Sequence, residues 1–248
     1  MSTPPEFARY HAQEDMQRDL AACLALHILT DSVWSRGRDK RTIASAALDG
    51  GATVIQLRDK TASTRLLVEE GLALRQLTYE RGALLIVNDR IDVALAIDAD
   101  GVHLGQDDDM PIHLARRLLG PHRILGISAG NMEEVQAAIA AGADYLSIGP
   151  IYATRAKADA GPPIGLRLLR ELAARASTPL VAIGGITAEN AGEVIQAGAM
   201  GVAVITTVVG SEDVASSARR LSIVLQSALA ARRDETHAES DTSPKLSS

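Results

Sequence analysis

Two cations and an amide stand together where an apolar run ends, in the motif QLRDK at residues 56–60. Side chains alternate along a strand, so Gln56, Arg58 and Lys60 would project to one side and their neighbours to the other. Two cations beside an amide suit the binding of an anion. The alternative is a solvated strand end, but the preceding ATVI is apolar on both faces, which favours a functional site.

Carboxylates follow two further apolar runs. Asn88 and Asp89 lie in the motif VNDR, and three consecutive aspartates at 107–109 lie in GQDDDMP. Asp89 either caps the helix expected just after it or binds a ligand, and the sequence does not choose between the two. Within the triplet, Asp109 is the expected N-cap of a helix whose first turn contains Pro111.

Capping explains one aspartate of the triplet, but three clustered carboxylates repel one another unless a positive charge lies among them. A divalent cation would supply that charge. Magnesium typically takes one or two protein carboxylates and completes its shell with water and substrate phosphate oxygens. We therefore predict that Asp89 and Asp108, on adjacent strands, hold Mg²⁺.

Smaller polar groups follow the later apolar runs. Ser128 lies in GISAG, and a long loop at 149–163 carries Thr154 and Lys157. Long loops in compact domains are often functional, so this loop is expected to act as a lid, with an ordinary exposed connection as the alternative.

Two glycines, Gly184 and Gly185 in AIGGIT, precede an expected helix, and Ile205 and Thr206 end the last apolar run. Exposed backbone amides and a helix start favour an anion, so these positions predict a phosphate site. Together with the cations and carboxylates, they describe two anion sites, one of them bound to a metal.

Eight short apolar runs must position these groups. They are LALHILTD, ATVIQLRD, LLIVND, GVHLG, ILGISA, YLSIGP, PLVAIG and GVAVIT. Helical patterns lie between them, for example at 63–81, 133–141, 165–176 and 188–197, and several end in a Gly-Ala pair that caps the helix.

Strands that are apolar on both faces and separated by single helices are parallel. Eight such units predict one α/β domain, a (β/α)₈ barrel, over residues 23–231. A doubly wound open sheet is the alternative, but the glycine-rich dinucleotide turn is absent after the first strand. Reactive groups of the barrel fold gather at the carboxyl ends of the strands, where the motifs above lie.

The composition narrows the classes of partner and compartment. The formal charge of −6 argues against nucleic acid. With a single cysteine, Cys23, and no apolar leader or membrane-length segment, we expect a cytoplasmic protein. His27 and His103 lie within strands and are expected to be core residues rather than catalysts.

The two ends of the chain lie outside the repeat. Residues 1–22 form an N-terminal extension that could cross the bottom of the barrel or form a subunit contact. The polar tail 232–248 has few apolar residues and is expected to be disordered. The oligomeric state stays open, a homo-oligomer included.

Taken together, the motifs resemble the thiamine-phosphate synthase (thiamine-phosphate pyrophosphorylase) family over about residues 24–230. The resemblance rests on LTD, VIQLRDK, IVNDRIDVALAIDADGVHLGQDD, ILGIS, GADYLSIGPIYATRAK, AIGGIT and GVAVIT. It implies a (β/α)₈ barrel that joins 4-amino-2-methyl-5-(diphosphomethyl)pyrimidine to 4-methyl-5-(2-phosphoethyl)thiazole, or its carboxylate, and releases pyrophosphate.

The resemblance also implies roles for individual residues. The pyrimidine diphosphate would contact Gln56, Arg58, Lys60, Asn88, Ser128 and Lys157. The thiazole phosphate would contact Thr154, Gly185, Ile205 and Thr206. Asp89 and Asp108 would hold Mg²⁺, and the reaction would be a dissociative substitution that needs no protein nucleophile.

Two positions depart from the family pattern. Many relatives have a threonine where Ala156 stands, so a hydroxyl near the thiazole phosphate is missing. Many also have His-Thr where Gly130 and Asn131 stand. The related thiazole tautomerase and regulatory homologue needs that histidine, so Gly130 argues against it. A non-catalytic barrel that binds thiazole phosphate or thiamine phosphate remains an alternative, as does an isomerase of another phosphorylated metabolite.

Overall fold

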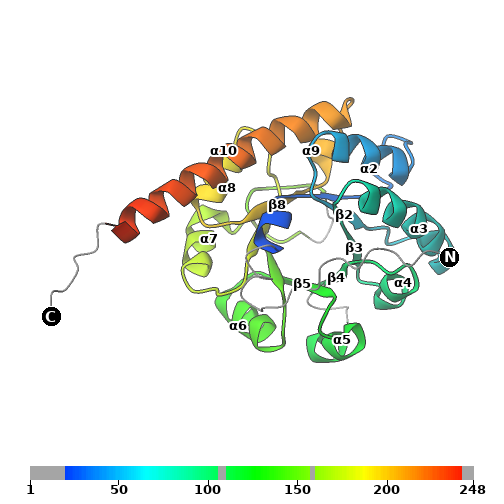
Figure 1. Cartoon of the computed structure of the whole chain (residues 1–248), viewed down its shortest axis with the longest axis horizontal. Helices are drawn as coiled ribbons and strands as arrows, with labels where there is room; N and C mark the ends of the chain where they lie inside the picture. The colour runs from blue at the N-terminus through cyan, green and yellow to red at the C-terminus, as the bar shows by residue number, and fades with distance from the viewer. Residues whose placement is uncertain (1–19, 106–109, 157–159, 242–248) are drawn as a thin grey trace.

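Eight parallel strands close into a barrel in the computed structural model, which describes residues 20–105, 110–156 and 160–241 (Figure 1). Each strand pairs with the next in sequence, and β8 pairs with β1. The strands are β1 (Leu26–Leu29), β2 (Val54–Leu57), β3 (Leu84–Asn88), β4 (Gly101–Leu104), β5 (Ile124–Ala129), β6 (Tyr145–Ile148), β7 (Leu180–Ile183) and β8 (Gly201–Val204). The barrel fold predicted from the eight apolar runs is confirmed.

Helices surround the strands in a ring (Figure 1). They are α2 (Lys40–Asp49), α3 (Thr64–Glu80), α4 (Ile91–Ala96), α5 (Ile112–Leu119), α6 (Met132–Ala140), α7 (Gly165–Ala173), α8 (Ala191–Gln196), α9 (Thr206–Val209) and α10 (Val214–Asp241). Side chains of Asp39, Ser63 and Asn131 accept backbone hydrogen bonds at the starts of α2, α3 and α6. Such caps satisfy amides that have no partner within the helix.

The strands are apolar on both faces because each face is buried in a different layer. Outward side chains such as Leu57 and Val102 pack under the helices in the larger core cluster. Inward side chains such as Val54, Ile86 and Val181 fill the barrel interior in a smaller cluster. This is the double burial that a closed parallel barrel requires.

Glycines at the helix-to-strand junctions have the left-handed conformation that the sequence predicts. Gly142 follows α6 with φ of 90°, and Gly198 follows α8 with φ of 109°. A side chain is strained at such angles, so glycine ends the helix at low cost and returns the chain to the sheet.

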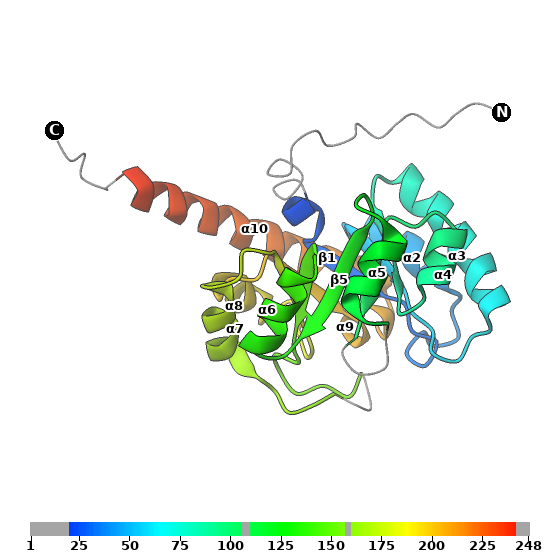
Figure 2. The same cartoon turned by 90° about the horizontal axis from the view of Figure 1, so that it is seen from below.

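The C-terminal helix differs from the sequence prediction. Disorder was expected from residue 232, but α10 continues to Asp241 and projects beyond the barrel (Figure 2). Arg232 explains part of the difference, because its guanidinium donates hydrogen bonds of 2.7 Å to the carbonyl oxygens of Ile195 and Ala199. Contacts with the preceding barrel unit thus compensate for the few apolar residues of this segment.

At the other end of the chain, residues 20–23 are helical and Leu20 packs against the interior cluster of the barrel. Gly201, at the start of β8, lies close to the residue that follows this helix, since a Cβ atom at Gly201 would lie 1.8 Å from the carbonyl oxygen of Leu24. The segment therefore closes one end of the barrel, and the other end stays open for ligands. Among the helices that the structure describes, none combines the length and the apolar character needed to cross a membrane.

Candidate active site

A cavity of about 430 Å³ opens at the carboxyl ends of the strands. Such a volume lies within the range of small-molecule sites. The structure brings together nine of the residues predicted from the sequence, because all nine line this cavity. They are Arg58, Lys60, Asn88, Asp89, Ser128, Thr154, Gly185, Ile205 and Thr206.

Arg58 forms the most buried positive charge of the cavity wall. Its guanidinium pairs with the carboxylate of Asp31, which follows β1, and the side chains are only 9% and 8% exposed. The backbone amide of Arg58 also donates a hydrogen bond of 2.9 Å to Oγ1 of Thr30, the residue that follows β1. Within the described residues, Nε of Arg58 has no acceptor. A buried donor without a partner is costly, so the site favours an anionic ligand here.

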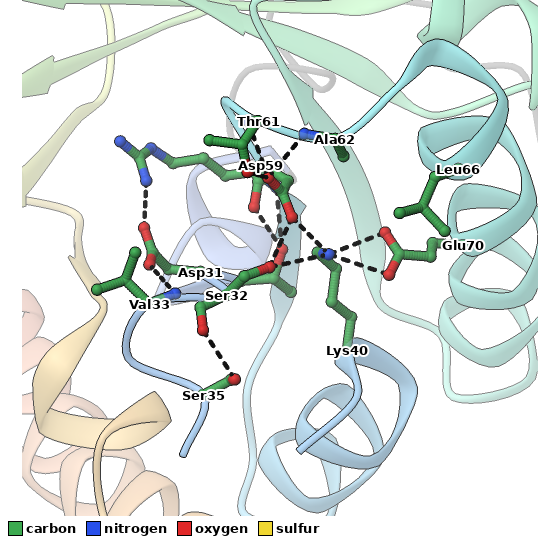
Figure 3. Close-up of polar contacts among 12 residues, drawn as sticks. Asp31, Ser32, Val33, Ser35, Lys40, Asp59, Thr61, Ala62, Leu66 and Glu70 are labelled. Carbon is green, nitrogen blue, oxygen red and sulfur yellow. Dashed lines mark hydrogen bonds and ion pairs between the residues drawn. The ribbon is translucent and has the colours of Figure 1, made fainter. Parts of the chain in front are cut away.

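A second group of ion pairs holds the turn that follows Arg58. Figure 3 shows Lys40 reaching from α2 to Asp59 on one side and Glu70 on the other. Its Nζ atom lies 2.9 Å from Asp59 Oδ2 and 3.0 Å from Glu70 Oε1. Ser32 donates a further hydrogen bond of 2.6 Å to Asp59.

The pKa values of this group follow from burial and from these contacts. Burial alone would lower the pKa of Lys40, but the hydrogen bonds and charges of Glu70 and Asp59 raise it above its usual value. Burial would raise the pKa of Asp59, and hydrogen bonds from Ser32, Lys40 and Thr61 lower it well below its usual value. Both groups are therefore charged at neutral pH and fix the turn.

The alternation predicted for QLRDK is confirmed by these contacts. Arg58 and Lys60 line the cavity, whereas Leu57 packs in the outer core and Asp59 pairs with Lys40. Gln56 lies deeper, inside the barrel, and lines a second small cavity of about 10 Å³. Its Oε1 atom is buried without a hydrogen-bond partner in the described part of the chain.

Asp89 lies at the cavity with φ of 63°, and its backbone amide donates to the carbonyl oxygen of His103 at 2.8 Å. Asp89 does not cap the following helix. The cap residue of α4 is Arg90, whose side chain makes no capping hydrogen bond. Left-handed conformations of non-glycine residues are uncommon and are enriched at functional sites.

Three predicted residues, Asp108, Asp109 and Lys157, lie outside the described residues. The structure does place Pro111 in the cap position of α5, one residue before the first turn. Two expectations are therefore corrected, because the cap residue of α5 is Pro111 itself: Pro111 stands one residue before the first turn, and the N-cap is not Asp109.

The donor chemistry around Asp89 fits magnesium. One carboxylate oxygen donor from the end of β3 meets a cavity that also holds the amide of Asn88. Within 20–105, 110–156 and 160–241, His, Cys, Asp and Glu side chains form no group of three or more that could hold a metal ion. Magnesium typically takes one or two protein carboxylates, so the residues present suit an ion shared with substrate phosphates.

Ser128 lies on β5, where its hydroxyl is 3.0 Å from His103 Nε2. His103 also contacts Tyr145, with 3.0 Å between Nδ1 and the phenolic oxygen. His103 is 6% exposed and thus a buried histidine with polar partners, as predicted. It also lines the cavity, a position that the sequence interpretation did not give it.

The phosphate end of the cavity is built from two turns. Gly184 and Gly185 follow β7 with φ of 98° and 65°, and side chains there would collide with Pro150 and Ala153. Only glycine therefore allows this turn to pass under the neighbouring loop. Ile205 and Thr206 follow β8 on the other side, where Thr206 begins α9.

The first residues of the loop predicted to act as a lid are hydrogen-bonded to the end of β7. The amide of Ile151 donates to Ile183 at 2.9 Å, and that of Tyr152 donates to Gly184 at 3.0 Å. Ala156, one of the two departures from the family pattern, donates its amide to Thr154 Oγ1 at 3.1 Å. Thr154 therefore already has one local partner within the loop.

The second departure also has a local explanation. The amide of Gly130 donates to Glu134 Oε2 at 2.7 Å, and Asn131 Oδ1 accepts from the Glu134 amide at 3.0 Å. This is a reciprocal cap at the start of α6. It places the Glu134 carboxylate at the cavity wall beside Gly130.

Sequence reasoning missed Asp31, Lys40 and His103 as parts of the site. Asp31 had a usable signal, because it is a carboxylate directly after an apolar run, like Asp89. Lys40 had no such signal in the sequence, since it lies in a helix and reaches the site only because α2 packs beside α3.

Comparisons with known proteins agree with this geometry. A family model described as thiamine monophosphate synthase matches residues 26–208. The chain is 56% identical to the thiamine-phosphate synthase of Chloroflexus aurantiacus over 196 residues, which cover 79% of this chain and 90% of the relative. It is 52% identical to that of Moorella thermoacetica, over 79% of this chain and 93% of the relative.

Among solved structures, a thiamine phosphate pyrophosphorylase from Pyrococcus furiosus superposes with a TM-score of 0.78. Its sequence is 43% identical, and the match covers 85% of this chain and 99% of the other. The family model, the relatives and the solved structure thus point to one group of enzymes. The chain belongs to the thiamine-phosphate synthase family.

Proposed function

We propose that this chain joins a pyrimidine methyl diphosphate to a thiazole phosphate, or to its carboxylate, giving thiamine phosphate and pyrophosphate, with carbon dioxide as a third product when the carboxylate is the substrate. The observation that carries this proposal is the single cavity wall that combines Arg58 and Lys60 with Asp89 at one end and the Gly184–Gly185 turn at the other. One end suits a diphosphate with a metal ion, and the other suits a simple phosphate.

In the proposed reaction, the bond between the pyrimidine methylene carbon and the diphosphate oxygen breaks first, and its electron pair leaves with the diphosphate. The electron-rich ring stabilises the resulting cation. The thiazole nitrogen then donates its lone pair to the methylene carbon, so no protein nucleophile is needed.

Residues of this chain assist the departure of the diphosphate. Arg58 and Lys60 neutralise the charge that develops on the leaving oxygen, and Asn88 and Ser128 donate hydrogen bonds to it. Because Asp31 holds the Arg58 guanidinium before the substrate binds, little reorganisation is needed when the bond breaks. In the proposal Lys157 completes this subsite, and Gln56 lies below it in the barrel interior, where it lines the smaller cavity.

Magnesium, held by Asp89 and Asp108, would supply further positive charge to the diphosphate. At the other end, Thr154, Gly185, Ile205 and Thr206 hold the thiazole phosphate and direct the nitrogen toward the methylene carbon. The substrates are small molecules, and we infer a cytoplasmic enzyme without nucleic-acid or membrane partners.

The direct test is to incubate the full chain with both substrates and to measure thiamine phosphate and pyrophosphate, with Mg²⁺ and with EDTA. We expect both products with Mg²⁺ and none with EDTA. If the chain binds both substrates but makes no product, the non-catalytic alternative is correct and the transferase proposal fails.

Asp89→Asn tests the metal site within this proposal. We expect kcat to fall by on the order of 100-fold and the affinity for Mg²⁺ in the presence of pyrophosphate, measured by calorimetry, to fall with it. Asp98→Asn is the matched control, because Asp98 also has a positive φ but its side chain is 80% exposed. Equal Mg²⁺ affinity in the two variants would contradict the assignment of Asp89.

A further inference from the structure

Three polar side chains form a line from the barrel interior to the cavity. Tyr145 on β6 contacts His103 on β4, and His103 contacts Ser128 on β5, with 3.0 Å at each step. Tyr145 is 1% exposed, whereas Ser128 is half-buried and lines the cavity. The line therefore connects a fully enclosed hydroxyl to one that a ligand can reach.

The barrel is shaped around the Tyr145 ring. A Cβ atom at Gly126 would lie 2.1 Å from Cζ of Tyr145, so a larger residue on β5 would displace the ring. The ring of His103 stacks with the Tyr145 ring, with centroids 5.6 Å apart, and the ring of His27 meets it in a T-shaped arrangement with centroids 5.5 Å apart. These contacts hold the phenolic oxygen against the imidazole.

Burial fixes the direction of the hydrogen bonds. It raises the pKa of Tyr145, so the phenol keeps its proton. Within the described residues the hydroxyl has one hydrogen-bond partner, His103 Nδ1. A buried phenol needs an acceptor for its proton, so Nδ1 is the acceptor. In a neutral imidazole the proton then lies on Nε2, which donates to Ser128 Oγ.

We propose that Tyr145 is a positioning residue that acts through His103 to keep the Ser128 hydroxyl a donor toward the diphosphate. Because Ser128 accepts from Nε2, it does not donate its proton to the histidine. His103 Nε2 donates to the hydroxyl oxygen of Ser128, so the hydroxyl proton points to an acceptor other than His103. This inference rests on the proposed function for the contact between Ser128 and the leaving diphosphate.

Tyr145→Phe removes the one hydroxyl and keeps the ring that fills the space beside Gly126. We expect kcat to fall by about tenfold, the effect of one hydrogen bond, with less than about a twofold change in KM for the thiazole phosphate. Tyr79→Phe, on the outer surface of α3, is the matched control and should behave as the wild type.

Two further measurements separate positioning from a merely structural role. Nitrogen-15 NMR of histidine-labelled protein, with His103 assigned by its loss in His103→Gln, should show the proton on Nε2 in the wild type and a mixture of tautomers in Tyr145→Phe. In a Ser128→Ala background, Tyr145→Phe should reduce kcat by less than about twofold, because its effect passes through Ser128.

Each outcome decides the inference. An Nδ1 proton in the wild type, or a full tenfold loss of kcat from Tyr145→Phe in the Ser128→Ala background, would overturn it. If the wild type makes no thiamine phosphate, the proposed function fails, and the NMR spectra still decide the direction of the hydrogen bonds. Normal turnover in Tyr145→Phe would overturn the inference and leave the proposed function intact.

Discussion

His27 lies inside the barrel as a neutral imidazole, and this predicts how acid destabilises the fold. Burial lowers the pKa of His27 from 6.5 to about 3, although a hydrogen bond with the backbone of Leu24 acts in the opposite direction. The residue is 1% exposed, and in the part of the chain that the structure describes its Nε2 atom has no partner. Within the described residues, no charged group offsets the effect of burial on this imidazole.

The sign and size of the effect follow from proton binding. Above pH 6.5, His27 is neutral in the folded and the unfolded chain, so it adds no pH dependence. Below that value the unfolded chain binds a proton that the folded chain does not, until the pH reaches the folded pKa. The slope is about 1.4 kcal/mol per pH unit, so lowering the pH from about 7.5 to about 5 removes about 2 kcal/mol.

His27→Gln removes this titration and keeps a polar side chain. Urea unfolding at the two pH values gives the free energy of unfolding for each protein, and other titrating groups cancel in the difference. We expect the wild type to lose about 2 kcal/mol more than the variant. The exposed His122→Gln is the control and should follow the wild type. Parallel pH dependences of wild type and His27→Gln would refute the reasoning.

Two further predictions concern the ion pairs behind the cavity. Asp31→Asn leaves Arg58 buried without its counter-ion, so we expect a loss of about 3 kcal/mol in the free energy of unfolding and on the order of 100-fold in kcat/KM. Urea unfolding and steady-state kinetics measure these, and an unchanged kcat/KM would show that the pair does not orient the guanidinium. Lys40→Met leaves two carboxylates unpaired and loosens the turn that carries Lys60, so KM for the pyrimidine diphosphate should rise about tenfold while KM for the thiazole phosphate stays constant. Equal changes in both KM values would contradict the specific role of this turn.

The barrel was predictable because its strands obey a simple pattern. Runs such as LLIVND and GVAVIT are apolar on both faces, and a closed parallel barrel is an arrangement that buries both. The cavity residues were predictable for a related reason. Polar residues directly after such runs, among them Asn88 and Thr206, must lie at the carboxyl end of the barrel, where the structure places them.

Contacts between units were not predictable from the pattern. The pairing of Asp31 with Arg58 depends on the register of β1 beside β2, and the contact of Tyr145 with Ser128 through His103 depends on which side chains point inward at the same level. Likewise, the extension of α10 past residue 231 depends on carbonyl oxygens of another unit that accept from Arg232. Such interactions arise from packing, which periodicity does not describe.

The last helix, α10, also determines when the fold can be completed during synthesis of the chain. At its start α10 packs on α2, where Arg219 donates to the carbonyl oxygen of Asp49 at 2.9 Å, and further along it is fastened beside α8 by Arg232. It therefore covers the seam where β8 meets β1. During synthesis every strand leaves the ribosome before this helix does, so the cover over the β8–β1 seam cannot form until the chain has been translated at least as far as Arg232.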